Sequence, residues 1–569
     1  MKRTRRWILA SDKDAPEESP LSEEICGSPW IARLLQRRGF RSDEEAAEFL
    51  RPQLRKLRDP FLLPQMRVAV DRILRAIDTG EKIVLYGDYD VDGVTSLALL
   101  NEMLCAYGAA PALFLPMRME EGYGLSAGAI ERCWQAHRPA LLIAVDCGTA
   151  SCAEIADLCA RGAEVIVLDH HEPKAELPNC IALVNPKAGP ESEFRYLCSV
   201  GVVFKLCHAC LKTRPLPDFD LRQRLDLVAL GTVADIVPLE AENRILVHHG
   251  AREIANRRLL GISRLLDVAG IRPPIAAEHI GFRLGPRLNA AGRLANAEKA
   301  LRLLLTTDQA EAHALADELD AQNRERQNLE REIVLAAEEK IAQQALGDAP
   351  AIILGERGWH PGVLGIVAAR IARTYHRPAI MIGFDDDGLG KGSGRSIDGL
   401  SLVSALGESA DLLEKFGGHE MAAGVTIRQE NFATFAARFR ENCGRLLTAE
   451  HLEPRLYLDA ELTLRDIGWN LLRWHELLQP FGRGNPQPLF FARGVEPAFT
   501  PRILKEKHLA LRLRQDGRFQ RAVYFGGAEA PLPEPPWDVA FRISGDEYEG
   551  EIRLQMQVEA LRSTAPLET

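Results

Sequence analysis

Three aspartates at alternate positions, Asp88, Asp90 and Asp92, follow a short apolar run at residues 84–86. The run predicts a buried strand and residues 94–107 predict a helix, so the acids are expected on a strand-to-helix turn. In an α/β sheet such a turn lies at the carboxyl edge of the strand, where ligands bind. Because three carboxylates this close together repel one another unless a cation neutralises them, the segment predicts a metal site.

Three other interpretations of this segment can be compared with a metal site of that kind. A calcium-binding loop begins with the same Asp-x-Asp-x-Asp-Gly pattern, but Leu99 stands at the twelfth position, where a bidentate glutamate is needed. A phosphate-binding loop requires a lysine after its last glycine, whereas Gly93 is followed by Val94. A solvated acidic turn without any ligand stays open as long as this segment is considered alone.

Two further apolar runs also end in side chains that can bind metal. Residues 141–145 are followed by Asp146, and residues 165–168 are followed by Asp169-His170-His171. Helical segments separate these runs, which predicts a mainly parallel sheet with right-handed connections. The carboxyl ends of such strands meet at one edge, so the sequence concentrates acids and imidazoles at a single place.

A fourth acid, Asp235, stands in an otherwise apolar stretch at residues 227–239. An aspartate in such surroundings is seldom buried unless it is paired or ligated, although a helix cap is the alternative. A second histidine pair, His248-His249, has no acid cluster or strand end beside it. We therefore expect that pair to be structural.

The full set of candidate ligands is larger than one ion requires. A mixture of carboxylates and imidazoles suits Mn²⁺ better than Ca²⁺, and Mg²⁺ stays open. Two ions about 3.5–4 Å apart, bridged by one carboxylate, fit the set better and can activate a water for attack on phosphorus. The set consists of Asp88, Asp90, Asp92, Asp146, His170, His171 and Asp235.

Length and composition restrict the class of protein. A chain of 569 residues is too long for one core, and its net charge of −10 provides no general attraction for nucleic acid. Any binding of that kind must come from local basic stripes. The 11 scattered cysteines favour reduced thiols and a cytoplasmic location. No stretch is long enough to span a membrane, and the basic start is followed by too short an apolar run for a signal peptide.

Five segments can be distinguished along the chain. Small helices are expected over residues 1–75, and a parallel α/β domain over 76–305. One long helix, polar on most sides, is expected to connect domains over 306–346. A second α/β domain follows over 347–450, and short strands indicate a small β-domain over 454–565.

Four other segments have compositions suited to nucleic acid. Residues 281–293 combine arginines and an asparagine with glycines, which suits phosphate contacts, although a solvated loop is the alternative. Residues 390–396 and 416–424 are rich in glycine and predict loops whose backbone N–H groups approach phosphate. The hairpin at 508–524 has a basic face with Phe519 and Tyr524 interleaved, which suits a single strand; an ordinary solvated strand is the alternative.

The acid and histidine segments resemble, in order, the four motifs of the DHH phosphoesterase superfamily. Residues 417–424 are similar to the signature of the DHH-associated domain, and the long connector, residues 390–396 and the terminal β-domain extend the resemblance over nearly the whole chain. This arrangement is similar to the bacterial members that degrade single-stranded DNA. It implies an α/β fold: a DHH domain with a mainly parallel sheet, a long connecting helix, a second α/β (DHH-associated) domain and a C-terminal OB-fold-like β-barrel.

The resemblance also implies roles for individual residues. Asp88, Asp90 and Asp146 would hold one Mn²⁺. Asp92, Asp146, His170 and Asp235 would hold the other, with Asp146 as the bridge. The expected catalytic groups are Asp146, Asp169 and His171, the last of which would contact the scissile phosphate or support the ligands. The expected DNA-binding residues are Arg118, Arg287, Asn289, Arg293, Arg395 and His419 near the cleavage site, and Arg512, Arg514 and Arg518 on the barrel.

The activity implied is a 5′→3′ exonuclease on single-stranded DNA that releases mononucleotides in repair and recombination. One alternative is a DHH phosphoesterase for cyclic dinucleotides or very short RNA, which has no need of the β-domain. Another is a silent DNA-binding scaffold, which would be expected to have lost ligands. Expected partners are single-stranded DNA with a 5′ end and, by resemblance, a single-strand-binding protein and a RecQ-type helicase. A monomer without membrane contact is expected.

Overall fold

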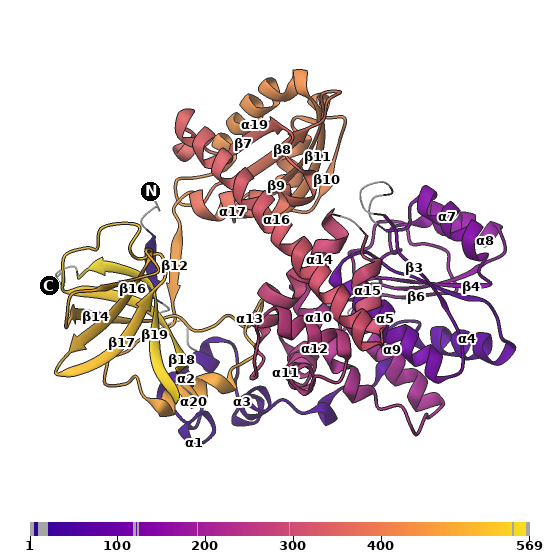
Figure 1. Ribbon diagram of the computed structural model, residues 1–569, viewed down its shortest axis with the longest axis horizontal. Coiled ribbons are helices and arrows are strands. Elements are labelled where there is room, and N and C mark those ends of the chain that lie inside the picture. Colours follow the sequence, from indigo (N-terminus) through magenta and orange to yellow (C-terminus); the bar gives the residue numbers. More distant parts are fainter. Residues whose placement is uncertain are drawn as a thin grey trace.

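The computed structural model describes residues 5–9, 21–117, 121, 124–189, 192–294, 296–548 and 551–564. In Figure 1 a β-barrel lies at the left, one α/β domain at the top and a larger α/β domain at the right. A single long helix connects the two α/β domains. No helix among the described residues combines the length and the apolar composition needed to cross a membrane.

The larger domain contains a five-stranded sheet in the order β3-β2-β4-β5-β6, and all of its strand pairs are parallel. Every residue of β2 and β4 is buried, which explains their continuous apolar sequences. The parallel sheet expected from the sequence is confirmed. The strands are β2 (Ile83–Tyr86), β3 (Ala112–Phe114), β4 (Leu141–Val145), β5 (Glu164–Leu168) and β6 (Ala182–Val184).

Helices cover both faces of this sheet. Alternate strand residues pack against α4, α5 and α9 on one face and against α7 and α8 on the other. Because β2, β4 and β5 are neighbours in the sheet, their carboxyl ends lie side by side. The helices are α4 (Met66–Thr79), α5 (Val91–Ala106), α7 (Ala127–His137), α8 (Cys152–Ala160) and α9 (Ser199–Thr213).

The second half of this domain is helical. Residues 281–293, for which a solvated loop was the alternative, begin in a π-helix and continue as α14. The glycines of this segment therefore do not make it a loop. The elements are α10 (Leu225–Ala234), α11 (Ala241–Asn256), α12 (Leu260–Val268), α13 (Ala277–His279), the π-helix Ile280–Leu284, α14 (Gly285–Leu294) and α15 (Glu298–Leu305).

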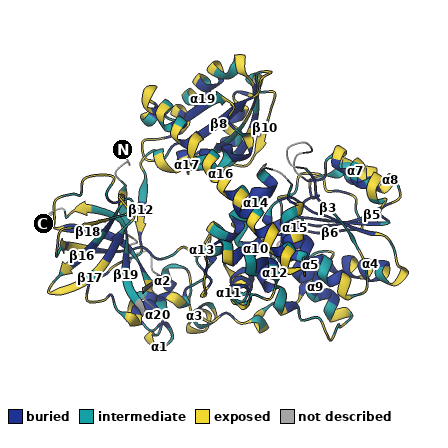
Figure 2. Cartoon of the chain, in the orientation of Figure 1, coloured by how far each residue is buried: buried dark blue, intermediate teal, exposed yellow. Residues whose placement is uncertain are grey.

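The predicted long helix is confirmed as α16 (Gln309–Gln343), whose 35 residues extend about 52 Å. It begins at the cap residue Asp308, whose carboxylate accepts a hydrogen bond from the backbone N–H of Glu311. Its first half packs into the core of the larger domain through residues such as Leu319, and its second half packs into the other domain through residues such as Ile333. Buried and exposed residues alternate along it in Figure 2.

The second α/β domain has the strand order β10-β11-β9-β8-β7, in which only the β7–β8 pair is parallel. Two segments predicted as glycine-rich loops are strands instead. Residues 390–396 lie mostly in β9, and residues 416–424 form the hairpin of β10 and β11. The elements are β7 (Ile352–Arg357), α17 (Pro361–Tyr375), β8 (Ala379–Phe384), β9 (Leu389–Arg395), α18 (Leu402–Gly407), β10 (Lys415–Gly418), β11 (Ala422–Arg428) and α19 (Phe432–Leu446).

Close packing explains the glycines of β9. A Cβ atom at Gly390 would lie 2.6 Å from the Phe384 ring, and one at Gly392 would lie 2.6 Å from Ile382. A Cβ atom at Gly394 would lie 2.8 Å from Leu402. The alternating glycines therefore make room for side chains of neighbouring elements, and the segment is a strand where the sequence predicted a loop.

The C-terminal domain is a closed barrel, which confirms the expected OB-fold-like architecture. Its strand order is β13-β14-β18-β19-β17-β16-β15, and an additional β14–β16 pairing closes it. The predicted hairpin is formed by β16 and β17. The elements are β12 (Arg455–Leu458), β13 (Ala460–Glu461), α20 (Trp469–Leu477), β14 (Phe490–Pro497), β15 (Arg502–Leu504), β16 (His508–Gln515), β17 (Arg518–Tyr524), β18 (Trp537–Tyr548) and β19 (Glu551–Ser563).

The N-terminal helices pack on this barrel, although the two are far apart in the sequence. Ile31 and Leu35 belong to the same hydrophobic core as Phe490 and Phe541. The first strand also pairs in parallel with β12. The N-terminal elements are β1 (Arg6–Leu9), α1 (Glu23–Cys26), α2 (Pro29–Arg37) and α3 (Asp43–Leu50).

Candidate metal centre

The ends of β2, β4 and β5, together with the end of α10, bring the candidate ligands together. Three groups each have ligand atoms within 4.8 Å of one another. Asp146 occurs in two of the groups and therefore lies between them. The groups are Asp88, Asp90 and Asp146; Asp92, His170 and Asp235; and Asp146, His170 and His171.

The turn after β2 is held from two sides. Asp90 caps α5, because its Oδ1 accepts a hydrogen bond from the Gly93 N–H at 3.1 Å. The Val91 N–H donates to Oδ1 of Asn289 at 3.1 Å. A Cβ atom at position 93 would lie 2.5 Å from the Asp88 carbonyl oxygen, so glycine is required there. The chain can therefore present Asp88 and Asp90 close together.

The N-terminus of α9 holds two of the carboxylates. The N–H groups of Ser199 and Val200 donate to the two oxygens of Asp92 at 2.7 and 2.8 Å. The Ser199 hydroxyl donates to Oδ1 of Asp146 at 2.9 Å. Asp146 itself has a left-handed backbone, with φ of 61°, which aspartate tolerates better than most residues. Ser199 is not distinguished in the sequence, since a serine at the start of an apolar helix is a common feature.

Asp235 is a helix cap that also lies among the candidate ligands. It is the C-terminal cap residue of α10, and its Oδ2 lies 3.5 Å from Nε2 of His170. The stretch before Asp235 is apolar because it forms α10, which is buried among neighbouring helices. A helix end and a candidate ligand thus coincide at the same residue.

His170 lies at the centre of the acids. Its Nε2 is 3.5 Å from Oδ1 of Asp146 and 3.9 Å from Oδ2 of Asp92. The residue is only 7% exposed, and neither ring nitrogen makes a hydrogen bond. Burial and the nearby His171 lower the pKa of His170 to about 3, so the imidazole is neutral, as a metal ligand must be. A buried nitrogen without a hydrogen bond among carboxylates fits a bound cation.

The carboxylates themselves also fit a divalent cation. Burial, reinforced by neighbouring carboxylates, raises the pKa of Asp92 to about 7 and that of Asp235 to about 8. The same causes raise the pKa of Asp146 well above its usual range. A cation among them would stabilise the ionised forms and reverse these shifts. The residues present therefore suit Mn²⁺ or Mg²⁺.

His171 has the opposite protonation to its neighbour. Its Nδ1 lies 2.7 Å from Oδ1 of Asp169, a buried carboxylate that also accepts the Thr149 N–H at 3.0 Å. Burial lowers the pKa of His171, but the hydrogen bond and charge of Asp169 outweigh it and raise the pKa to about 9. The Asn185 side chain donates to the His171 carbonyl oxygen at 2.9 Å. His171 is thus an oriented, charged imidazolium, and Asp169 lies in none of the three ligand groups.

Most of the expected DNA-binding residues near the cleavage site already contact protein groups. Arg287 bonds to Asp320 of α16, Asn289 supports the acidic turn, and Arg293 donates to the Gly362 carbonyl oxygen at the start of α17. Arg395 ends β9 and donates to Ser393 Oγ and to the Gly394 carbonyl oxygen, and His419 is exposed between β10 and β11. Arg118 lies outside the described residues. Contact of these residues with DNA stays a prediction.

The barrel presents an arginine between two exposed aromatic rings. The guanidinium carbon of Arg512 lies 5.3 Å from the ring centre of Phe519 and 5.7 Å from that of Phe499. These two rings are 48% and 64% exposed. Arg514 pairs with Glu496, and Arg518 is exposed at the hairpin turn. Phe499 is not distinguished in the sequence, because it precedes the hairpin that it joins in space.

Tyr524 does not share this surface. It is partly buried and packs against the barrel core, contrary to the sequence-based expectation that it is interleaved with the basic side chains. The remaining alternation is confirmed, because Leu511 and Leu513 are buried whereas Arg512 and Arg514 are exposed. The aromatic surface of the hairpin is therefore formed by Phe519 together with Phe499.

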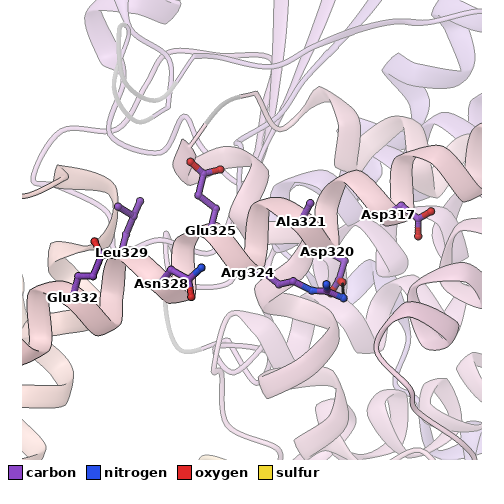
Figure 3. A pocket seen from close by; sticks show the side chains of 8 residues that line it. All are labelled: Asp317, Asp320, Ala321, Arg324, Glu325, Asn328, Leu329 and Glu332. Carbon is purple, nitrogen blue, oxygen red and sulfur yellow. Dashed lines mark ion pairs between the residues drawn. The ribbon is translucent and has the colours of Figure 1, made fainter.

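A cavity of about 630 Å³ lies along α16 (Figure 3). Carboxylates dominate its lining, and its one arginine, Arg324, pairs with Asp320 at 2.6 Å. This lining does not suit a phosphate, because like charges repel. The residues are Asp317, Asp320, Ala321, Arg324, Glu325, Asn328, Leu329 and Glu332.

Three family models match successive parts of the chain. The DHH family, N-terminal domain, matches residues 82–232, which contain the first three ligand segments. The DHHA1 domain matches residues 339–445, and the RecJ OB domain matches residues 458–560. Each model matches part of one of the three folded units that the structure shows.

Individual relatives match over most of the chain. The single-stranded-DNA-specific exonuclease RecJ of Bacillus subtilis is 40% identical over 85% of this chain, which spans 61% of that protein's length. The protein of the same name from Dickeya dadantii is 35% identical, covering 93% of this chain and 95% of its own. A crystal structure of RecJ in complex with Mn²⁺ from Thermus thermophilus is 34% identical, with a TM-score of 0.83 over 99% of this chain and 80% of that one. The chain therefore belongs to the RecJ family.

Proposed function

We propose that this chain is a metal-dependent exonuclease specific for single-stranded DNA, which degrades the strand from its 5′ end to mononucleotides. The names of its relatives support the reaction and the substrate. The observation that carries the proposal is the convergence of Asp92, Asp146, His170 and Asp235 with Asp88 and Asp90 at one sheet edge. Repair and recombination of DNA are the processes that such an activity serves.

Mn²⁺ is the proposed cofactor, with two ions bound. The Thermus thermophilus RecJ structures contain Mn²⁺ in one case and Mg²⁺ in another, so either ion suits related proteins. We assign one ion to Asp88, Asp90 and Asp146. We assign the other to Asp92, Asp146, His170 and Asp235. When bound, the ions supply a lowered pKa for water and charge stabilisation at the phosphodiester.

The chain's own groups orient the reacting phosphate. The His171 imidazolium, held by Asp169, donates a hydrogen bond to a non-bridging phosphate oxygen and stabilises its growing charge. Ser199 and the N-terminus of α9 keep Asp146 and Asp92 in place. Because these donors are fixed before substrate arrives, little reorganisation is needed during the reaction.

The barrel binds the strand away from the metal centre. Phe499 and Phe519 offer faces on which bases stack, and Arg512 between them pairs with a phosphate or stacks on a base. Stacking does not depend on base identity, which suits an enzyme that degrades any sequence. Arg287, Asn289, Arg293, Arg395 and His419 are the proposed contacts near the cleavage site, together with Arg118.

The proposed setting is the cytoplasm, where the chain acts as a monomer with a single-strand-binding protein and a RecQ-type helicase. All 11 cysteines are free thiols, which agrees with a reducing compartment. The helicase would generate the 5′-ended single strand that the nuclease consumes. These partners follow from the family resemblance.

The direct test uses single strands labelled at either end, together with a matched duplex, in the presence of Mn²⁺. We expect the 5′ label to be released first as a mononucleotide, the 3′-labelled strand to shorten progressively, and the duplex to persist. Early release of the 3′ label would contradict the direction, and equal loss of duplex would contradict the strand preference. Asp146→Ala should stop hydrolysis while strand binding persists, because the barrel residues are unchanged.

A further inference from the structure

A buried arginine of α11, Arg244, joins the larger α/β domain to the barrel side of the molecule. Its Nε donates to the Phe49 carbonyl oxygen at 2.8 Å. Its Nη1 and Nη2 donate to the carbonyl oxygens of Leu478 and Leu477 at 2.9 and 3.0 Å. The residue is only 3% exposed, and its guanidinium lies 3.7 Å from the centre of the Phe49 ring. One side chain thus contacts two distant parts of the sequence.

The three carbonyl groups lie at the C-terminal ends of two helices, α3 and α20. The last carbonyls of a helix lack partners within the helix and carry partial negative charge. Arg244 satisfies both helix ends, and within the described part of the chain it forms no ion pair with a carboxylate. Burial lowers its pKa to about 9, so the guanidinium stays charged at neutral pH. The contact between Arg244 and the two helix ends therefore depends on a positively charged group that can donate three hydrogen bonds.

Both helices belong to the body of the barrel unit. Leu50 of α3 and Leu471 of α20 lie in the core that the N-terminal helices share with the barrel. The Asn485 side chain also donates to the Leu478 carbonyl oxygen at 2.8 Å, and Arg38 donates to the Pro486 carbonyl oxygen at 2.6 Å. Arg244 is consequently attached to a packed structure and not to a loose loop.

The contact between the larger α/β domain and the barrel unit also includes Pro238 and Leu239, which follow the proposed ligand Asp235 closely in the sequence. The Leu239 N–H donates to the Arg483 carbonyl oxygen at 2.7 Å. A Cβ atom at Gly482 would lie 2.7 Å from Leu239, and one at Gly484 would lie 3.1 Å from Pro238. Gly484 also has φ of 77°, so glycine is needed there for two reasons. A short, closely packed segment therefore runs from the metal centre to the barrel unit.

We propose that Arg244 is a positioning residue, which fixes the orientation of the barrel relative to the metal centre so that a strand held on the barrel reaches the ligands in register. This inference rests on the proposed function and adds a residue that touches neither DNA nor metal. A flexible junction would let the strand stay bound to the barrel while its 5′ end misses the metal centre. Long substrates therefore depend on Arg244, and substrates too short to reach the barrel do not.

The test compares Arg244→Met with Arg252→Met, which removes an exposed arginine of the same helix. For Arg244→Met we expect kcat on a long single strand to fall about tenfold, the equivalent of ~1.4 kcal/mol, because the strand stays bound to the barrel while its 5′ end misses the metal centre. Hydrolysis of a thymidine dinucleotide and the Kd for Mn²⁺ should stay unchanged. Arg244→Lys should recover part of the loss, since an ammonium group can donate to the same carbonyls. Arg252→Met should behave as the unaltered protein.

Two outcomes would overturn the proposal: an unchanged kcat on the long strand, or an equal loss of kcat on strand and dinucleotide. X-ray scattering of the free protein provides a readout without catalysis, in which Arg244→Met should broaden the distribution of interatomic distances and Arg252→Met should not. If the unaltered protein fails to shorten 5′-labelled strands, the proposed function fails, while scattering still tests the junction. If Arg244→Met does not fold, Arg244→Lys carries the same comparison.

Discussion

The chain contains two pairs of adjacent histidines, and only one of them lies in a reactive environment. His170 and His171 have ring centres 4.5 Å apart at the edge of the parallel sheet, and His248 and His249 have ring centres 5.2 Å apart in α11. The second pair has arginines nearby, and burial lowers the pKa of both of its members, that of His248 to about 4. His249 is in contact with the Pro52 carbonyl oxygen at 3.2 Å. Both rings are therefore neutral and structural.

Carboxylates create the difference at the first pair. Asp169 makes His171 a cation at neutral pH, whereas His170 is neutral among acids that favour a metal ion. Two adjacent histidines thus have different charge states, one neutral and one positive. A pair of histidines alone therefore does not define a site of this kind. The site also requires the acids that the neighbouring strand ends supply. The following experiments test how far this contrast extends.

The largest expected effect comes from removing one imidazole of each pair. His170→Ala should lower kcat about a thousandfold or more, because a ligand held among three carboxylates is lost. His248→Ala should leave kcat within about twofold, since that ring contacts no acid cluster. Rates on a 5′-labelled single strand with Mn²⁺ measure both variants. Similar losses in the two would erase the distinction between the pairs.

The second test concerns the charged member of the reactive pair. His171→Gln should lower kcat about a hundredfold while Mn²⁺ binding persists, because the ring acts on the phosphate. Since the active form of His171 is protonated and the hydrogen bond and charge of Asp169 raise its pKa, activity should fall at alkaline pH, where the imidazolium loses its proton. The variant should lack this alkaline decline. His249→Gln, the matched change in α11, should keep both the rate and the pH profile.

A smaller effect is expected from Ser199, whose hydroxyl donates to Asp146. Ser199→Ala should weaken Mn²⁺ binding about tenfold, because partners that orient ligands contribute 10- to 100-fold to affinity. Ser96→Ala is the control: Ser96 is buried in the same domain, but its hydroxyl makes no hydrogen bond. Titration calorimetry with Mn²⁺ distinguishes the two. Equal affinities in both variants would show that the acids hold their positions without Ser199.

The smallest effect concerns stability without metal. Asp92 and Asp235 have folded-state pKa values of about 7 and 8, above the unfolded value of about 4. The folded state therefore binds more protons between these values, so the free energy of unfolding should decrease as pH rises from about 5 to 8. Urea unfolding in the presence of a chelator should show this slope, and Asp235→Asn should reduce it. Mn²⁺ should raise the free energy of unfolding most near pH 8, where the carboxylates are ionised. An increase of the metal-free free energy of unfolding with pH would contradict the raised pKa values of Asp92 and Asp235.

The sequence predicts which acids and imidazoles converge, because each of these segments follows or interrupts an apolar run. Asp146 and His170 come directly after buried strands, and the order of strands in a parallel sheet places such ends together. Asp235 stands out because its neighbours are apolar. Ser199 and Asn185 carry no comparable signal, since their roles depend on which distant backbone groups lie opposite them.

Glycine-rich segments and long-range contacts were the least predictable features. The same spacing of glycines suits a phosphate loop and a strand such as β9 that packs against large side chains, and local sequence does not distinguish them. Arg244 looks like a surface residue of an amphipathic helix, although it is buried against carbonyls more than 190 positions away in either direction. Contacts of this type follow from the assembled fold and not from any local pattern.

The core shared by the first helices and the last strands has a consequence for biosynthesis. Ile31 and Leu35 are translated more than 450 positions before Phe490 and Phe541, with which they share a core. At ~5–20 residues per second, roughly 25–100 s separate these events. Throughout that interval the apolar side chains of the N-terminal helices lack the barrel core against which they pack. We therefore expect nascent chains of this protein to bind ribosome-associated chaperones.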